Sequence, residues 1–143
     1  MEAPGLHLRR AGDVDRVLKA AIEYNDGPCV IEAEVVLISK KSVGDENRWV
    51  YLDIGKFGGL AETMDESIRY AIRTPHDGAE MTPCVLAGPT CDSADVLYEK
   101  QPYELPVSLE IGDKVLIEGT GAYTTTYASV AFNGFAPLKA YHI

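Results

Sequence analysis

The stretch GPTCDS at residues 88–93 places a thiol directly beside a carboxylate. Glycine and proline are turn residues, so Cys91 and Asp92 are predicted to leave a turn together. Such a turn could present a thiol and a negative charge to a bound molecule. Taken singly, both residues have commoner explanations, because an isolated cysteine is usually buried and an isolated aspartate usually caps a turn. Their meaning therefore depends on the rest of the chain.

Metal and disulfide chemistry find little support in the residue types. The three cysteines, Cys29, Cys84 and Cys91, are an odd number and lack a CxxC spacing. That pattern argues against a disulfide framework and against a zinc site. The three histidines also stand far apart, at positions 7, 76 and 142. We therefore expect no metal site.

Charge and length exclude several classes of partner. The net charge of −9 argues against nucleic acid, because phosphate binding needs a basic face. No apolar run approaches the roughly 18 residues of a membrane helix, and the first residues lack the apolar stretch of a secretory signal. A chain of 143 residues has the length of one domain. We expect a cytoplasmic protein without a membrane partner.

The elements that must position the turn alternate between short strands and turns. Residues 13–25 carry one apolar stripe at helical spacing, and a breaker follows at 25–28. Strand patterns then occupy residues 29–41, 48–55, 81–88 and 115–118. In the first of them, the pattern puts four apolar side chains on one face: Ile31, Ala33, Val35 and Leu37. A helical turn is predicted in 61–67, and a turn with a final strand in 132–143. Many short strands with few helices indicate a β-barrel or sandwich.

Each of these residues is a weak indication of function by itself, but three motifs in a fixed order are together specific. They are GPTCDSADVLYEK at 88–100, LEIGDKVLIEGTGAYTTTYAS at 109–129, and FNGF at 132–135. Their joint spacing resembles the C-terminal β-domain of pyridoxal-phosphate-dependent ornithine/lysine decarboxylases, the fold-type III, alanine-racemase-like group. VIEAEVVLISKK at 30–41 and WVYLDIGKFGGLAETMDES at 49–67 are similar to the same domain. The resemblance covers about residues 30–143.

The resemblance implies a domain layout. It predicts a mainly β fold with a single modified Greek-key β-barrel or sandwich in residues 29–143. Residues 1–28 do not match the family and form an atypical N-terminal segment with one short amphipathic helix, which could cover apolar surface.

Roles for the turn residues follow from the resemblance. The family uses the cysteine of its GPTCD motif, which matches Cys91, to protonate the substrate Cα after CO2 has left. A free thiol suits this step because a pKa of about 8.5 keeps it protonated yet transferable near neutral pH. Asp92 would hold the distal ammonium of the substrate. The aspartate favours ornithine or lysine over diaminopimelate, whose decarboxylases carry glutamate there, although arginine decarboxylases share Cys-Asp-Ser.

Other positions match family residues less closely. Tyr123 in GAYT matches a tyrosine that contacts the cofactor phosphate, for which a phenol is a suitable donor. Phe132 matches a residue near the substrate pocket. Glu66, with Asp65 beside it, is the candidate for a second acid on the distal amine, but an exposed helix charge explains either residue as well.

The resemblance also implies what these residues need from elsewhere. In the family, the Cys-Asp loop of one subunit completes the active site of its dimer partner. The cofactor lysine lies in an N-terminal (β/α)8 barrel of about 250 residues, and no lysine here stands in a matching context. We expect pyridoxal 5′-phosphate to bind only together with a barrel domain. The chain alone is expected to hold no cofactor and to be inactive, pairing with itself or with a barrel-containing subunit.

Two alternatives stay open at this point. The chain could be a non-catalytic module that pairs with intact decarboxylase subunits and regulates them, or a stable relic without activity. The preferred diamino acid and the role of residues 1–28 also stay open.

Overall fold

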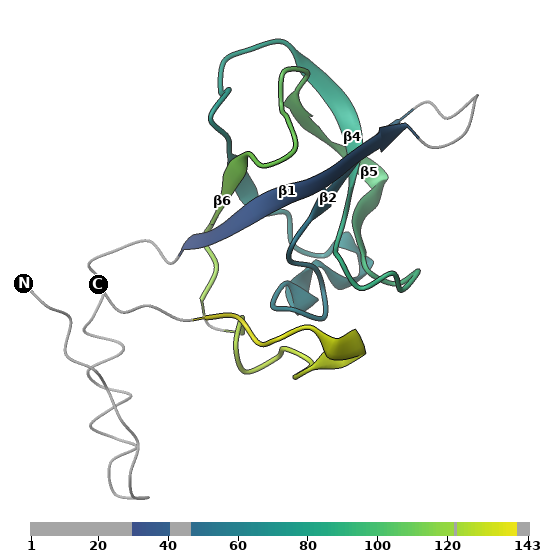
Figure 1. Cartoon of the computed structure of the whole chain (residues 1–143), viewed down its shortest axis with the longest axis vertical. Coiled ribbons are helices and arrows are strands. Elements are labelled where there is room, and N and C mark those ends of the chain that lie inside the picture. Colours follow the sequence, from purple (N-terminus) through teal and green to yellow (C-terminus); the bar gives the residue numbers. More distant parts are fainter. Residues whose placement is uncertain (1–29, 41–46, 122, 140–143) are drawn as a thin grey trace, which may run out of the picture. The chain divides into compact units, whose positions relative to one another are not determined.

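A computed structural model of the chain describes residues 30–40, 47–121 and 123–139. Strands dominate the described elements (Figure 1): β1 (Val30–Lys40), β2 (Arg48–Leu52), the 3-10 helix η2 (Ala61–Glu66), β3 (Ala71–Arg73), β4 (Met81–Ala87), β5 (Val96–Pro106), β6 (Lys114–Glu118) and the 3-10 helix η3 (Phe132–Gly134). All of these elements lie within one unit of the chain, Cys29–Leu138. The predicted mainly β class is confirmed.

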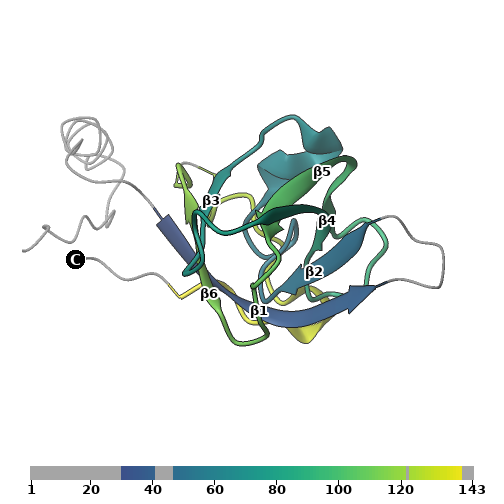
Figure 2. The same ribbon diagram turned by 90° about the horizontal axis from the view of Figure 1, so that it is seen from above.

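The strands form one mixed sheet in the order β3-β6-β1-β2-β4-β5. Neighbouring strands are antiparallel, except for β2 and β4, which are parallel. Strand β1 joins the two halves of the sheet, because its first part pairs with β6 and its second part with β2. Seen from above, the sheet curls around a common interior (Figure 2). The barrel-like fold predicted from the sequence is therefore present as a curled half-barrel.

Strand β1 shows why the sequence pattern predicts its burial only in part. Ile31, Ala33 and Val35 alternate into the core as expected. The register with β2 then shifts between Val35 and Leu37, which leaves an extra residue in β1. After this bulge, Leu37 is 45% exposed. The expectation that it shares the buried face is wrong, because a one-residue shift moves a side chain to the other face.

Two outer segments of the sheet meet through tyrosine hydroxyls. Tyr103 of β5 donates to the carbonyl of Tyr70 at 2.9 Å and accepts from the amide of Ile72 at 3.1 Å. Tyr98 likewise accepts from the amide of Tyr70 at 3.0 Å and donates to the carbonyl of Ile68 at 3.1 Å. No backbone ladder joins β3 and β5 among the described residues. Side chains therefore hold together the two ends of the curled sheet.

The interior is filled by alternating side chains from all parts of the sheet. Its largest fully buried side chains include Leu52, Leu60, Leu86, Leu97, Tyr98 and Leu105. A smaller cluster of Trp49, Val85 and Ala87 lies apart from it. Burying this much apolar surface stabilises the sheet that carries the loops.

Several predicted elements can be compared with the structure. The strands expected in 29–41, 48–55, 81–88 and 115–118 are confirmed as β1, β2, β4 and β6, and the helical turn in 61–67 as η2. Strands β3 and β5 were not anticipated. The helix expected in 13–25 lies outside the described residues. Of the final strand expected after FNGF, residues 140–143 also lie outside them, and residues 136–139 are not a strand. Across the described part of the chain, no helix is long and apolar enough to span a membrane.

Candidate functional site

The GPTCDS turn connects β4 to β5 and is closed at its base by backbone hydrogen bonds. The amide of Gly88 donates to the carbonyl of Asp95 at 2.8 Å. Within the turn, the amide of Asp95 donates to the carbonyl of Asp92 at 2.9 Å, and the amide of Ala94 donates to Asp92 Oδ1 at 2.8 Å. One carboxylate oxygen of Asp92 is thus used to shape the turn, while its second oxygen can still accept a bond from a ligand.

Cys91 is the exposed member of this turn. Its φ of 59° lies in the left-handed region, which residues other than glycine seldom occupy. The thiol makes only a weak contact with its surroundings, at 3.8 Å from the carbonyl oxygen of Pro89. Cys84 on the preceding strand is the opposite case, because it is buried and burial raises its pKa to about 12. Of the two cysteines among the described residues, one therefore presents its thiol and the other buries it.

The residue at the end of the same turn, Asp95, carries a buried carboxylate. It is only 1% exposed, and its carboxylate accepts three hydrogen bonds. Its Oδ1 accepts from the amide of Lys56 at 2.7 Å. Its Oδ2 accepts from the Thr90 hydroxyl at 2.6 Å and, less closely, from the Thr90 amide at 3.3 Å. The residue directly before Cys91 is thus held from inside the fold.

Two glycines make room for this carboxylate. A Cβ atom on Gly55 would lie 2.1 Å from Asp95 Oδ1, and one on Gly88 would lie 2.3 Å from Asp95 Oδ2. Neither position tolerates a side chain while Asp95 stays in place. The first residue of the GPTCDS motif is therefore a glycine for a reason of packing, in addition to its place at the start of a turn.

The FNGF motif packs beside the same turn. Asn133 of η3 donates from Nδ2 to the carbonyl of Thr90 at 2.8 Å. Phe132 stacks on Phe57, with ring centroids 4.0 Å apart and planes within 11°. Both Thr90 and Phe132 line a small, mostly apolar hollow of about 60 Å³. The structure therefore places Phe132 close to the Cys91 turn.

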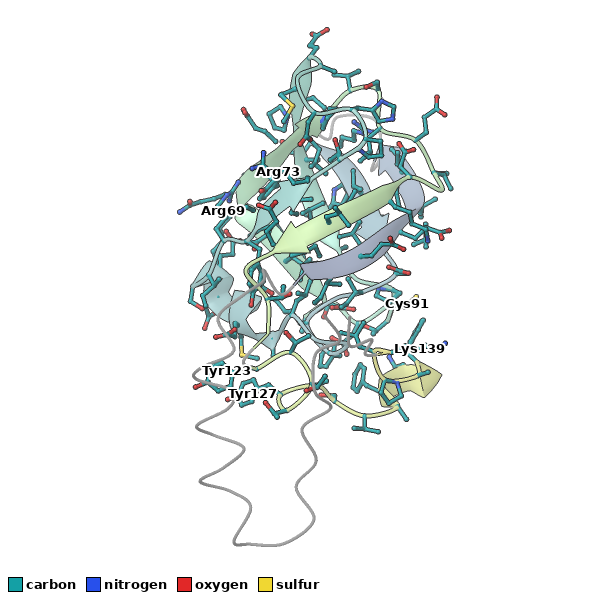
Figure 3. The ribbon with its side chains drawn as sticks, turned by 90° about the vertical axis from the view of Figure 1, so that its left-hand side faces the viewer. Arg69, Arg73, Cys91, Tyr123, Tyr127 and Lys139 are labelled. Carbon is teal, nitrogen blue, oxygen red and sulfur yellow. The ribbon has the colours of Figure 1, made fainter. Side chains whose placement is uncertain are left out.

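Tyr123 lies elsewhere on the unit. It is 55% exposed and meets Tyr127 edge to face, with centroids 6.1 Å apart. Figure 3 shows Tyr123 and Tyr127 together on one side of the unit and Cys91 on the other. The hydroxyl of Tyr123 has no hydrogen-bond partner among the described residues, so it is available to a phosphate oxygen. The chain thus carries two separate groups of candidate residues.

Glu66 is engaged by the chain itself. Its carboxylate accepts from the amides of Glu99, Lys100 and Gln101 at 2.9, 2.6 and 3.0 Å. Partial burial opposes ionisation, but these three backbone bonds outweigh it and hold the pKa of Glu66 below its usual value. Asp65 beside it is exposed, with its carboxylate 4.0 Å from Lys100 Nζ. In Figure 3, η2 lies on the side of Tyr123.

The sequence reasoning missed the residues that hold the turn. Asp95, Thr90 and Asn133 were not singled out, although each stands within or beside a motif that was. The sequence contains one signal for this anchor: an acidic residue, Asp95, at the end of the turn and a glycine, Gly88, at its start. No group of three potential metal ligands occurs among the described residues.

Known proteins resemble this chain in sequence. The family described as "Pyridoxal-dependent decarboxylase, C-terminal sheet domain" matches residues 28–121. A diaminopimelate decarboxylase of Helicobacter pylori is 38% identical over 96 residues, covering 66% of this chain and 22% of that protein. A lysine/ornithine decarboxylase of Selenomonas ruminantium is 37% identical over 99 residues, covering 69% and 24%.

A solved structure gives the same result in three dimensions. The lysine/ornithine decarboxylase of Vibrio vulnificus, complexed with cadaverine, superposes with a TM-score of 0.65 at 36% identity, covering 76% of this chain and 28% of that one. The chain thus spans about a quarter of the length of the relatives it matches. Cys91, Asp92, Glu66 and Asp65 fall within the matched range 28–121, whereas Tyr123 and Phe132 follow it.

Proposed function

This chain belongs to the pyridoxal-dependent decarboxylases as their C-terminal sheet domain, and we propose that it supplies a proton donor and a substrate-binding carboxylate to the decarboxylation of ornithine or lysine. The observation that carries this proposal is the state of Cys91. The thiol is exposed on a left-handed residue, while the residues around it are buried or hydrogen-bonded. A turn built in this way points the thiol in a fixed direction, toward solvent or a partner subunit.

The chain's own residues divide the work of the reaction. The cofactor, when bound, supplies the electron sink that decarboxylation requires. Cys91 Sγ donates a proton to the substrate Cα after CO2 has left. The free oxygen of Asp92 accepts from the distal ammonium of the substrate and so orients it. The hydroxyl of Tyr123 would donate to the phosphate of the cofactor and so help to hold it. The product is a diamine, which fits polyamine biosynthesis.

The separation of Cys91 from Tyr123 supports a site shared between two subunits. In Figure 3 the two side chains lie on different sides of the same unit. One chain could therefore contribute its Cys91 and Asp92 to one site and its Tyr123 to another. A homodimer, or pairing with a barrel-containing subunit, brings such half-sites together. By themselves the 143 residues are then expected to be inactive.

The remaining candidate site residues differ in the contacts that they make and therefore in the roles that they suit. Phe132 lines the hollow beside the Cys91 turn and can shield a bound substrate from water. Asp65 presents an exposed carboxylate on η2, and we assign it the second contact to the distal amine. Glu66 spends its carboxylate on three backbone amides, so we assign it the role of holding Asp65 in place.

A domain graft tests the proposed function. The sheet domain of the Selenomonas lysine/ornithine decarboxylase is replaced by residues 28–138 of this chain, and decarboxylation of ornithine and lysine is measured. We expect activity in the graft. Replacing Cys91 by Ala should lower kcat by about 100-fold or more, because a positioned acid contributes that much. Asp92→Asn should mainly raise KM.

Matched controls separate this role from its alternatives. Cys84→Ala removes the buried thiol instead, and should leave kcat unchanged once the fraction of folded protein is taken into account. An active graft in which Cys91→Ala has no effect would contradict the proposed proton donor. If the 143-residue chain instead bound to an intact decarboxylase and changed its rate irrespective of Cys91, the chain would be a regulatory module.

A further inference from the structure

We propose that Asp95 is a positioning residue, whose buried carboxylate fixes Thr90 and thereby the direction in which Cys91 and Asp92 leave the turn. The inference rests on the proposed function of Cys91 as a proton donor. It concerns a residue that takes no part in that chemistry itself, since Asp95 is only 1% exposed.

The geometry around Thr90 carries the inference. Its hydroxyl and its amide both donate to Asp95 Oδ2, and its carbonyl accepts from Asn133 Nδ2. All polar groups of Thr90 are thus bonded to side chains of the same unit, those of the buried Asp95 and the exposed Asn133. The next residue along the chain is Cys91, whose left-handed φ of 59° is unfavourable for a residue with a side chain. Such a conformation persists when its surroundings determine it, and Thr90 is the fixed neighbour that does so.

Asp95 also links the turn to a different part of the sheet. Its other oxygen accepts from the amide of Lys56, in the segment that follows β2. Gly55 and Gly88 lack the side chains that would collide with the carboxylate. The carboxylate is therefore enclosed by two segments that are distant in sequence, and it sets the position of the turn relative to the core. A buried carboxylate whose two oxygens both accept hydrogen bonds gives this kind of fixed geometry.

The backbone of the turn transmits this position to Asp92. The amide and the carbonyl of Asp95 both bond within the turn, to the carbonyl of Asp92 and the amide of Gly88. Asp92 in turn accepts from the amide of Ala94. One residue therefore holds the turn by its side chain and by its backbone, and Cys91 lies between the two anchored points, Thr90 and Asp92.

The test begins with the 143-residue chain, where no cofactor is needed. In Asp95→Asn, one accepting oxygen becomes an amide that opposes either the Lys56 amide or the Thr90 donors. We expect hydrogen exchange at the Ala94 and Asp95 amides to become about tenfold faster or more, because the turn that they close is loosened. Asp77→Asn is the matched control, since Asp77 accepts from the amide and hydroxyl of Thr74 on an exposed turn.

The functional arm uses the graft described above. Asp95→Asn should lower kcat about 10- to 100-fold with KM within about threefold, because a small misplacement of a reacting group has this size of effect. Thr90→Val removes the hydroxyl donor and should also lower kcat. Thr90→Ser keeps the hydroxyl and should keep the wild-type kcat. A loss of stability alone would lower the amount of active enzyme and leave kcat per folded molecule unchanged.

The outcomes separate this inference from the proposed function. If the graft is inactive or indifferent to Cys91, the proposed function fails, and the exchange measurement still decides whether Asp95 holds the turn. If Asp95→Asn leaves exchange at Ala94 and Asp95 unchanged, the positioning role is wrong. If the graft depends on Cys91 but Thr90→Val and Asp95→Asn keep the wild-type kcat, the role is also wrong. Should Asp95→Asn fail to fold, the pair Thr90→Val and Thr90→Ser gives the decision.

Discussion

Two cysteines close together in the chain show how strongly position determines chemistry. Cys84 lies on β4 inside the core, and burial raises its pKa to about 12, which makes it a poor nucleophile or metal ligand. Cys91 follows the same strand, but a left-handed turn places it at the surface. The difference arises from a short turn and its anchor at Thr90. Residue type alone would have given both cysteines the same prediction.

Glu66 gives a prediction at the scale of one residue. Its folded-state pKa lies below the unfolded value of about 4.3, so its stabilising effect is present above that pH and is lost as the pH falls toward the folded pKa. Glu66→Gln places an amide against a backbone donor and should lower the free energy of unfolding by about 1 kcal/mol at pH 7. Urea titrations from pH 7 downward should show this difference shrinking at acid pH.

Glu99 provides the control for this measurement. It is exposed and stands at one of the amides that Glu66 accepts from. Glu99→Gln keeps that amide and should change the free energy of unfolding by less than about 0.5 kcal/mol. Equal effects of Glu66→Gln and Glu99→Gln at pH 7 would show that the three backbone bonds add nothing to stability.

At the scale of elements, the curled sheet depends on side chains where its ladder ends. The hydroxyls of Tyr98 and Tyr103 bond to the backbone of the segment that leads into β3. The Arg69 guanidinium donates to the carbonyls of Gln101 and Pro102 and lies over both tyrosine rings. This set of contacts replaces a backbone ladder between β3 and β5 in the described part of the chain. It also supports η2, which precedes that segment.

Removing one hydroxyl tests this closure. In Tyr103→Phe, the carbonyl of Tyr70 and the amide of Ile72 both lose a partner. The free energy of unfolding should fall by about 1–3 kcal/mol, since unsatisfied polar groups at a partly buried site are costly. Tyr127→Phe removes a hydroxyl from a ring that is 64% exposed and should have little effect. Similar denaturation midpoints for the two variants would mean that the hydroxyl of Tyr103 does not hold the sheet ends.

At the scale of the whole molecule, the unit presents two groups of candidate residues on different sides. Cys91 and Asp92 share a turn, and Phe132 packs close to that turn, whereas Tyr123 lies elsewhere (Figure 3). A site that requires both groups then needs two copies of the domain. Under the proposed function, a sheet domain of about a quarter of its relatives' length would contribute residues to sites that it completes only together with a partner.

Mixing two defective grafts tests the shared site. One carries Cys91→Ala and the other Tyr123→Ala, and each alone should be nearly inactive. Coexpression should restore about a quarter of wild-type activity, because half of the dimers are mixed and each mixed dimer has one site with both intact residues. If the mixture stays as inactive as its components although mixed dimers form, Cys91 and Tyr123 act in the same subunit.

The sequence by itself determined the family, the mainly β class and the candidates Cys91, Asp92, Tyr123 and Phe132, because turn residues and motif spacing are local features that can be read directly. Strand β5 and the outward rotation of Leu37 depended on pairing between distant segments, which local patterns do not encode. The anchoring of Cys91 also needed the tertiary structure. Only folding brings the amide of Lys56, the hydroxyl of Thr90 and the carboxylate of Asp95 into hydrogen-bond contact, and a buried carboxylate is stable only where such donors surround it.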